Sequence, residues 1–465
     1  MDHYQTDRRP ASSHHTSNVR RNTGFLILAL VSIILGTAGA FFVPPVYLIA
    51  GVVAIMAATL ILRYPFFGFV TYMIIYFLRI GERLPFLAPL RVELVFGILL
   101  IIILIISDII NKRAKISFPT DRLTYSLILM VAVMSLSFVF SEWHTASYEA
   151  ILEFIKTLVL FYCIVVLLTD RKRFLTTFWL LALFTAFVGI EATINYHLGN
   201  YSVSQGIMRA GGATSYGEHP NSLAMYMASA IPLFIYLMAE TRSLWLRFIS
   251  VVIIGLCVYT MILTGSRSGL LMLIAEVLIY IWFFRQRIVA FIIFIALASL
   301  IWVVMPQQYQ DRYSSILDEE VDASSQGRLN AWKAGVEMFL DRPFLGVGPG
   351  VFAPAYFNRK GVYLSSHSMY VEAIATMGLL GTMAWIFFFI RLIQRARSLL
   401  KNDDYGGGII NQELSHVCIT IIGGLLIAGI FGHILLRDTW FITAGLLIAG
   451  AEINISTKPA NRGLE

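Results

Sequence analysis

Apolar runs long enough to cross a bilayer recur along almost the whole chain. A spanning helix needs about 20 mostly apolar residues. Of the 465 residues here, 58% are apolar and only 14% are charged, against about 45–50% and about 25% in soluble domains. A soluble multidomain protein, a coiled coil and a disordered chain are therefore excluded. We predict an all-α, polytopic membrane helix bundle of about 12 to 14 transmembrane helices, with spans starting near Gly24, Val46, Pro65, Val92, Leu123, Ala150, Phe174, Asn221, Leu246, Gly269, Ile288, Ser368, Ser415 and Thr439.

The positive charges predict an orientation. The polar start of the chain, before the first apolar run, carries arginines, and Lys and Arg favour the cytoplasmic side of a membrane. Alternating the spans from that start gathers most of the remaining cations in inner loops. We therefore predict an even number of spans with both termini in the cytoplasm. The net charge of +7 is too small and too scattered to predict a nucleic acid partner.

This topology divides the chain into five predicted segments. They are a cytoplasmic polar tail (1–23), an N-terminal transmembrane bundle (24–305), a long periplasmic loop (306–366), C-terminal transmembrane helices (367–453) and a cytoplasmic tail (454–465). Loops longer than about 15 residues are usually functional or disordered, and the aromatic residues of this loop argue against disorder. Leu329, Trp332, Val336 and Leu340 recur there at helical spacing, which predicts an amphipathic helix on the membrane surface.

Cations on the predicted outer face run against the bias that sets the topology, so each requires a reason. Most are arginines, whose planar fork of donors suits phosphate and stays charged when partly buried. As a group they predict an anionic, phosphorylated ligand at the outer boundary of the membrane. For any single one, the alternative is an ion pair or a contact with lipid headgroups. They are Arg79, Arg83, Arg91, Arg209, Arg267, Arg312, Arg328, Lys333, Arg342, Arg359, Lys360 and Arg437.

Two short polar segments hold the arginines of most interest. Arg267 lies in residues 264–269, a break of small and polar residues between two spans, where glycine allows close approach of a ligand. Arg209 lies in the medium-length loop 196–220, which reaches His219 just before the next span. The sequence leaves open whether the two segments meet.

His367 is the predicted proton acceptor. It opens a span, and an imidazole with an ordinary pKa of about 6.5 can be neutral and accept a proton from a hydroxyl. At about 100° per residue of helix, Gly378 and Gly381 return to the face that carries His367. Small residues let another helix approach, so we predict that this stripe faces the bundle interior. Glu372 points elsewhere and is predicted to pair with a neighbouring span.

The other ionisable residues are weaker candidates. His219 and His433 could serve as acid or base, and the spacing of Glu153 and Lys156 predicts a local ion pair. The histidines show no metal-ligand spacing, the cysteines fall singly in apolar runs, and no phosphate-loop motif is present. We therefore expect no metal, no cofactor and no nucleotide-driven chemistry.

At these residues the chain resembles the O-antigen ligase family, which includes lipopolysaccharide ligases, related polysaccharide polymerases and protein O-oligosaccharyltransferases. The family motif is a histidine, then Asn, Ser or Gln, nine residues and Gly-x-x-Gly. His367-Ser368 followed by Gly378-Leu379-Leu380-Gly381 matches it. A second family pattern, arginine and three residues before leucine, fits Arg267 through Leu271. Residues 328–350 resemble the family's long outer loop, and the N-terminal spans resemble the family in general character.

The resemblance implies a metal-independent, inverting glycosyltransferase of the bacterial inner membrane, with a helix arrangement like that of GT-C enzymes. The donor would be a glycan on undecaprenyl diphosphate. The acceptor would be a hydroxyl of a glycan or glycolipid, such as lipid A-core or a growing polysaccharide, on the periplasmic side among membrane lipids. The implied site residues are His367 and Arg267 for catalysis, Arg267, Arg209, Arg83 and Arg91 for the diphosphate, and Glu372, His219 and Arg328 in support.

Two other activities stay open at this point. A repeat-unit polymerase of the same family would use another lipid-linked glycan as acceptor, and the sequence does not separate it from a ligase. A flippase or other transporter for lipid-linked oligosaccharides would predict cations deep within spans and pseudo-symmetric halves. Here the unusual cations gather in predicted outer loops and we find no internal repeat, so the glycosyltransferase is favoured.

Overall fold

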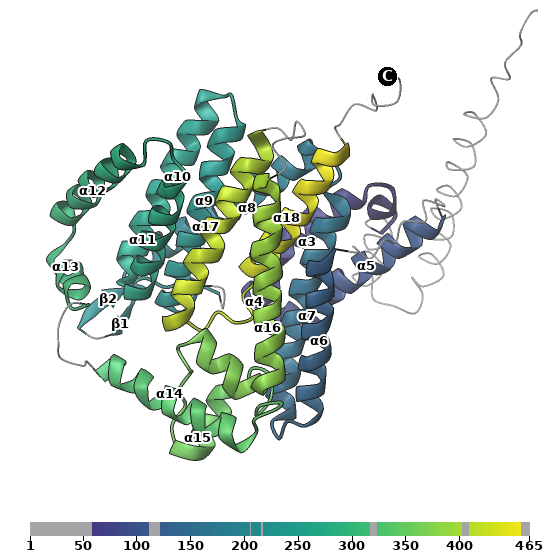
Figure 1. Cartoon of the computed structure of the whole chain (residues 1–465), viewed down its shortest axis with the longest axis vertical. Coiled ribbons are helices and arrows are strands. Elements are labelled where there is room, and N and C mark those ends of the chain that lie inside the picture. Colours follow the sequence, from purple (N-terminus) through teal and green to yellow (C-terminus); the bar gives the residue numbers. More distant parts are fainter. Residues whose placement is uncertain are drawn as a thin grey trace, which may run out of the picture. The chain divides into compact units, whose positions relative to one another are not determined.

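Helices make up nearly all of the computed structural model, which also has a two-stranded sheet among its described residues (Figure 1). The structure describes residues 58–110, 121–204, 206–214, 217–316, 323–401 and 409–456. The chain divides into two compact units, Met1–Phe69 with Leu99–Ala114 and Val70–Ile98 with Lys115–Glu465. We call the second the main unit, and every contact described below lies within it.

The elements follow one another with short connections for most of the chain. Strands β1 (Ser202–Ser204) and β2 (Ile207–Arg209) pair antiparallel. The helices are α3 (Pro65–Phe77), α4 (Ile80–Arg83), the 3-10 helix η1 (Pro85–Leu90), α5 (Val92–Ile110), α6 (Arg122–Val139), α7 (His144–Leu167), α8 (Arg171–His197), α9 (Pro220–Glu240), α10 (Leu244–Thr264), α11 (Arg267–Trp282), α12 (Arg287–Val304), α13 (Gln307–Ser314), α14 (Ala323–Asp341), α15 (Phe352–Lys360), α16 (Met369–Lys401), α17 (Ile409–Phe431) and α18 (Asp438–Ser456).

The predicted polytopic helix bundle is confirmed. In the described ranges, 8 helices are long and apolar enough to cross a membrane, namely α6, α7, α8, α9, α10, α12, α16 and α17, while α3 and α5 contribute shorter apolar stretches. Every span start predicted from Pro65 onward lies within two turns of an observed helix start. The starts predicted near Gly24 and Val46 lie outside the described residues. The total span count, the segment boundaries and the side on which the termini lie stay predictions.

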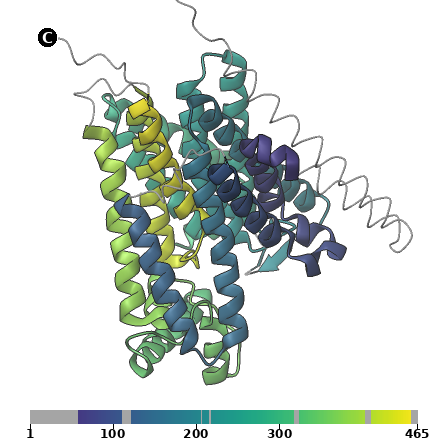
Figure 2. The same cartoon turned by 90° about the vertical axis from the view of Figure 1, so that its right-hand side faces the viewer.

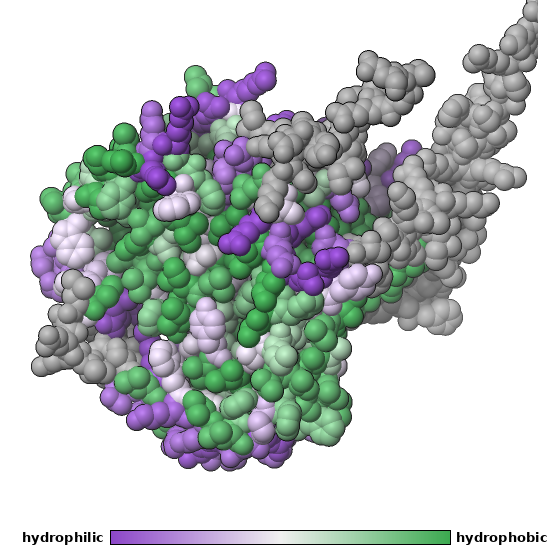
Figure 3. Space-filling view, in the orientation of Figure 1, coloured by the Kyte–Doolittle hydropathy of each residue, from purple (hydrophilic) through white to green (hydrophobic). Residues whose placement is uncertain are grey.

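Burial separates the centre of the bundle from its lipid-facing surface. Helix α9 packs against α8, α10, α11 and α17, and 72% of its most apolar stretch is buried. Helix α12 is apolar on every side, yet none of its most apolar stretch is buried within the protein, so α12 faces lipid. Figure 3 shows hydrophobic residues over much of the middle of one face and hydrophilic ones along its lower margin, over α14 and α15.

Helices α6, α7 and α16 extend to the end of the main unit where α14 and α15 lie (Figures 1 and 2). Helix α16 packs against α6, α14 and α17. Aromatic rings join α16 to α18: the buried Trp385 and Phe388 contact Phe441, and Phe389 contacts Trp440. This packing fixes the helix that follows the predicted catalytic histidine.

Gly378 interrupts the hydrogen bonds of α16, and residues of the long loop supply the missing partners. The φ and ψ of Gly378 are 61° and −160°, a conformation that is essentially limited to glycine. The N–H of Leu379 therefore donates outside the helix, to the carbonyl of Pro343 at 2.8 Å. The N–H of Leu380 likewise donates to the carbonyl of Phe344 at 3.1 Å.

The carbonyl groups on the other side of the kink are satisfied by the same loop. In an unbroken helix those of Ala375 and Thr376 would accept from the N–H groups four residues ahead. Here the N–H of Val347 donates to Ala375 at 3.0 Å, and that of Gly348 donates to Thr376 at 2.9 Å. Each helical bond lost at the kink is replaced by a bond to residues 343–348, so this segment is fixed to α16.

The amphipathic helix predicted in the long loop is α14. Leu329, Val336 and Leu340 are exposed, as an apolar face turned toward a membrane surface would be. The opposite face of α14 is buried. Its residues there are small or flexible, and Ala334 and Met338 pack among residues of α15 and α16. The helix thus has two apolar faces, and of the four residues in the predicted pattern Trp332 packs against the protein.

We expect Gly378→Ala to lower the stability of the folded protein by about 2–3 kcal/mol. Alanine is strained at this φ, and its Cβ would lie 2.6 Å from the backbone nitrogen of Gly346. Thermal unfolding in detergent measures the loss as a lower Tm. Gly255→Ala in α10 is the control, because no atom lies within 4 Å of the added Cβ. Equal Tm values for the two variants would contradict this role of the kink.

Candidate functional site

His367 lies in a left-handed turn just before α16. Its φ is 47°, and its side chain is half-buried. Residues other than glycine rarely adopt this conformation, and where they do the strain tends to lie at functional sites. Since His367 precedes the helix and Gly378 breaks it, the predicted single helical stripe of His367, Gly378 and Gly381 is wrong. Gly378 contacts the long loop instead.

Buried polar contacts hold the turn around His367. Ser366 and Ser368 are 0% and 3% exposed. The hydroxyl of Ser366 lies 3.1 Å from a carboxylate oxygen of Glu372 and 3.1 Å from the carbonyl of Ser368. The indole Nε1 of Trp332, on α14, donates to the carbonyl of Ser366 at 3.2 Å. The long loop therefore contacts the backbone on which the histidine is mounted.

Glu372 pairs outside its own helix, as the sequence predicted. Its carboxylate forms an ion pair with the imidazole of His433, in the connection between α17 and α18. Glu372 is buried, whereas the side chain of His433 is 56% exposed. The carboxylate raises the pKa of His433, so this imidazole stays protonated to a higher pH than an ordinary histidine.

The segments that carry Arg209 and Arg267 meet in the structure. Arg209, at the end of β2, is buried, and its Nε donates to the carbonyl of Thr264 at 2.6 Å. Its Nη2 donates to the side chain of Asn221, on the first turn of α9, at 2.7 Å. The N–H of Ala210 donates to the carbonyl of Leu263 at 2.9 Å. The segments 196–220 and 264–269, whose contact the sequence left open, therefore lie against each other.

Arg267 is the first residue of α11, and its position is set by that helix start. The hydroxyl of Ser266 caps the helix by accepting from the N–H of Gly269 at 3.2 Å. The half-buried guanidinium of Arg267 reaches Ser315, which follows α13, at 3.2 Å. Arg267 therefore links the break between two spans to the start of the long loop.

Two other guanidinium groups act through their charge on that of Arg209. Burial lowers the pKa of Arg209, and the positive charges of Arg267 and Arg328 lower it further. These residues come from β2, α11 and α14 respectively, and we call them the arginine cluster. Like charges repel, so an anion bound here would relieve an existing repulsion.

One of these charges, that of Arg328, also acts on His367. Its pKa is lowered, first because the ring is partly buried and then because Arg328, His433 and His219 place positive charge near it; Glu372 acts in the opposite direction. A lowered pKa leaves the imidazole neutral at neutral pH. His219, which precedes α9, is thus brought to the site as well. Arg328 is the residue whose charge acts on both Arg209 and His367.

Arg83 and Arg91 make their contacts elsewhere. Arg83 binds both carboxylate oxygens of Glu191, on α8, at 2.5 and 2.7 Å. Arg91 donates to Glu149, on α7, at 2.7 Å. Each guanidinium is therefore neutralised by a carboxylate of the protein, unlike the arrangement expected for a diphosphate ligand.

Two residues of the region were not among the predicted site residues. His433 was only a weak acid or base candidate, although it pairs with Glu372. Arg437, in the same connection, donates from Nη2 to the carbonyl of Ser222 on α9 at 3.1 Å. The signal that could have found both is their place in a short connection between two apolar helices that is rich in ionisable residues. Over the part of the chain that the structure describes, no three His, Cys, Asp or Glu residues gather as a metal site requires.

Comparison with known proteins identifies the central part of the chain. Residues 249–386 match the family described as O-Antigen ligase, and this stretch contains Arg267, Arg328 and His367. The resemblance to that family is thereby confirmed over these residues, and the match supports a membrane glycosyltransferase activity of the O-antigen ligase kind.

Other comparisons add little. No curated protein matches the sequence. A chain from the solved structure titled "Structural coordination of polymerization and crosslinking by a peptidoglycan synthase complex" is similar at 13% identity and a TM-score of 0.39. The similarity covers 70% of this chain and 96% of that chain.

We expect Arg328→Gln to raise the pKa of His367 toward its ordinary value of about 6.5, because it removes a positive charge that disfavours the imidazolium. Histidine-selective NMR titration in detergent measures the change. Lys333→Gln, an exposed cation on the same helix, is the matched control and should leave the pKa unchanged. The same His367 pKa in R328Q and wild type would show that Arg328 does not act on the histidine.

Proposed function

We propose that the protein transfers a glycan from undecaprenyl diphosphate to an acceptor hydroxyl at this site. The observation that supports it most is the arginine cluster beside a histidine whose pKa is lowered. A diphosphate leaving group needs positive charge, and a hydroxyl nucleophile needs a neutral base. Both are supplied here by residues from β2, α11, α14 and the turn before α16.

In this proposal the arginine cluster binds the diphosphate. The guanidinium groups of Arg209, Arg267 and Arg328 neutralise the charge that grows on the leaving oxygen as the bond from the anomeric carbon breaks. The bonding electron pair leaves with the diphosphate. The proposed diphosphate site does not include Arg83 or Arg91, because each already pairs with a carboxylate of the protein.

His367 accepts the proton of the acceptor. As the hydroxyl oxygen forms its bond to the anomeric carbon, its proton passes to the neutral imidazole. Attack from the face opposite to the diphosphate inverts the anomeric centre, and the imidazolium later returns the proton to solvent. This chemistry draws only on the side chains named and on the two substrates, so the proposal includes no metal and no cofactor.

The supporting residues have separate roles in the proposal. Glu372 and Ser366 hold the turn that carries His367, while His219 and His433 help to lower the pKa of His367. The site faces the periplasm of a bacterial inner membrane, and both termini face the cytoplasm. The acceptor is a glycan or glycolipid, with lipid A-core as the ligase substrate and a growing polysaccharide as the substrate of a polymerase.

We expect His367→Ala and Arg267→Ala each to lower turnover by at least about 100-fold. The assay uses purified protein in lipid nanodiscs with an undecaprenyl-diphosphate-linked glycan and lipid A-core. Arg359→Ala, which breaks the Arg359–Asp341 pair in the long loop, is the control and should retain activity. Product on lipid A-core identifies a ligase, and a lengthened lipid-linked glycan identifies a polymerase. Full activity of either H367A or R267A would remove that residue from the mechanism.

A further inference from the structure

A basic pocket lies between the start of α6 and the last turns of α16. It is open to the surface and its volume is about 370 Å³. None of its lining residues belongs to the arginine cluster or to the turn of His367. They are Asp121, Arg122, Leu123, Arg391, Gln394 and Arg395.

The pocket lies at the end of α16 that is far from His367. Helices α6 and α16 pack side by side (Figure 2), and both are long and apolar enough to cross a membrane. At 1.5 Å per residue, Gly378 and Arg395 are about 25 Å apart along α16, close to the roughly 30 Å thickness of a hydrocarbon core. Since Gly378 binds the long loop, the pocket lies at the opposite boundary of the membrane, which is the cytoplasmic one in the predicted topology.

Positive charge exceeds negative charge in the pocket, because three arginines and one carboxylate line it. The carboxylate, that of Asp121, caps α6 and pairs with Arg395 at 3.2 Å. Arg391 donates from Nη1 to the neutral amide of Gln394 at 3.0 Å, and Arg122 is exposed. Among the described residues, neither Arg391 nor Arg122 has a carboxylate partner. The pocket therefore attracts an anion.

Two of these arginines also have donors that the protein leaves unused. The Nε atoms of Arg391 and Arg395 are buried and have no hydrogen-bond partner among the described residues. Buried polar groups are nearly always paired, and unpaired ones are costly. The two residues are four positions apart on α16 and so lie on one face of the helix. Their planar guanidinium groups suit a phosphate, whose oxygen atoms can accept from both.

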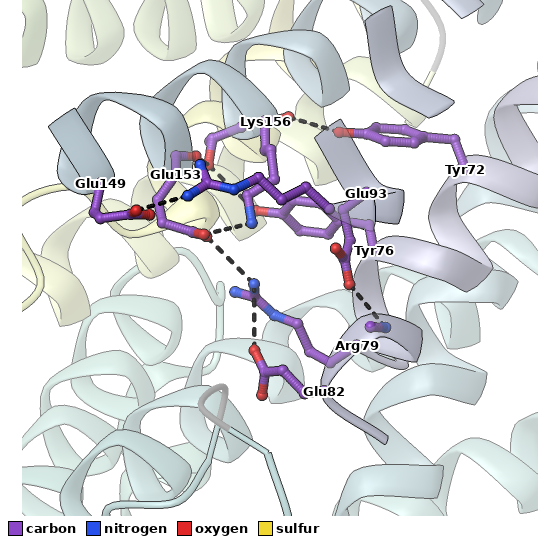
Figure 4. Close-up of polar contacts among 11 residues, drawn as sticks. Tyr72, Tyr76, Arg79, Glu82, Glu93, Glu149, Glu153 and Lys156 are labelled. Atoms are coloured by element: carbon purple, nitrogen blue, oxygen red, sulfur yellow. Dashed lines mark hydrogen bonds and ion pairs between the residues drawn. The ribbon is translucent and has the colours of Figure 1, made fainter. Parts of the chain in front are cut away.

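The charged cluster around Arg79, on the segment before α4, has a different balance (Figure 4). Arg79 pairs with Glu153 at 3.3 Å and with Glu82 at 3.7 Å. Lys156 also pairs with Glu153, as the sequence predicted. Carboxylates of the protein neutralise these cations, so that cluster has little attraction for an anion. The pocket between α6 and α16 is the better candidate for an anion site.

The surface of α6 beyond the pocket suits the alkyl chains of a lipid. Tyr125 and Leu129 follow Arg122 by one and two turns on the same face of the helix, and they are 55% and 44% exposed. They do not line the pocket and lie further along the span. A lipid whose phosphate is bound at Arg122 therefore has apolar side chains beside its alkyl chains.

We propose that this pocket binds a phosphate group through Arg391, Arg395 and Arg122. Basic pockets between membrane helices on the cytoplasmic side recognise anionic headgroups, so the phosphate has two sources, a phospholipid headgroup or a free phosphate in the cytoplasm. The site is separate from the transfer reaction, and the inference does not rest on the proposed function.

The test is native mass spectrometry of the full-length protein, titrated in detergent with phosphatidylglycerol or with inorganic phosphate. Dioleoylglycerol, which has alkyl chains but no phosphate, is the reference lipid. We expect Arg391→Gln to weaken the binding of one phosphatidylglycerol roughly tenfold, because a charged donor is lost. Arg397→Gln is the matched control, because Arg397 is an exposed arginine of the same helix that does not line the pocket. A phosphate bound at the arginine cluster is common to both variants and cancels in the comparison.

Asp121→Asn gives an expectation of opposite sign. Asparagine caps a helix about as well as aspartate, so α6 keeps its start while the carboxylate of the pocket is removed. We expect the bound phosphate compound to be held roughly threefold more tightly. Damage to the fold would not produce such a gain, so this variant separates an effect of charge from a loss of structure.

The outcomes also identify the source of the phosphate. Phosphatidylglycerol that binds more tightly than dioleoylglycerol assigns the pocket to a lipid headgroup. Binding of inorganic phosphate without phosphatidylglycerol assigns it to a free phosphate. Either result supports the site when R391Q binds more weakly than R397Q. Binding of neither probe, or equal affinities of R391Q, D121N and R397Q for the probe that binds, would overturn it.

Discussion

The exchange of backbone hydrogen bonds at Gly378 is the interaction on which the site depends. A helix interrupted inside a membrane protein has N–H and C=O groups that need partners, and residues 343–348 supply them. These bonds fix the long loop to α16. Two serine hydroxyl groups also hold the loop: Ser137 of α6 donates to the carbonyl of Leu345 at 2.7 Å, and Ser141, just after α6, donates to the carbonyl of Val347 at 3.0 Å. With the loop fixed, Trp332 of α14 can hold the carbonyl of Ser366 and so the turn of His367.

The fixed loop also brings positive charge to the histidine. Helix α14 carries Arg328, whose charge acts on both His367 and Arg209. Arg209 itself is held by the end of α10 and the start of α9. Charges from three separate parts of the chain are thus assembled against their mutual repulsion. The stability of the surrounding helices makes this possible, and the proposed diphosphate site rests on the relief of this repulsion by a bound anion.

The helices could be predicted from the sequence because each depends on a continuous apolar run. The meeting of the Arg209 and Arg267 segments could not, because it depends on long-range hydrogen bonds such as the one from Arg209 to Thr264. The role of Gly378 also could not be predicted from the sequence. A small residue at helical spacing from a histidine indicates helix packing, and only the partner segment 343–348 shows that the glycine is needed for a positive φ.

The partners of the arginines could not be predicted from the sequence either. Arg83 and Arg91 belong to the same pattern of outer cations as Arg267, and nothing in that pattern reveals that Glu191 and Glu149, on α8 and α7, neutralise them. On α14 the visible apolar residues, such as Leu340, are exposed, while the buried face uses alanine and methionine. Sequence patterns therefore predicted kinds of residue, and the structure shows which of them contact one another.

The most direct measurement of the central claim is binding of undecaprenyl diphosphate and of uncharged undecaprenol to the purified protein and to the triple variant R209Q/R267Q/R328Q. If the arginine cluster holds the diphosphate, the wild-type protein binds the diphosphate much more tightly than the alcohol, and the triple variant loses that preference. Equal binding of the two lipids by the wild-type protein, or an undiminished preference in a folded triple variant, would contradict the account.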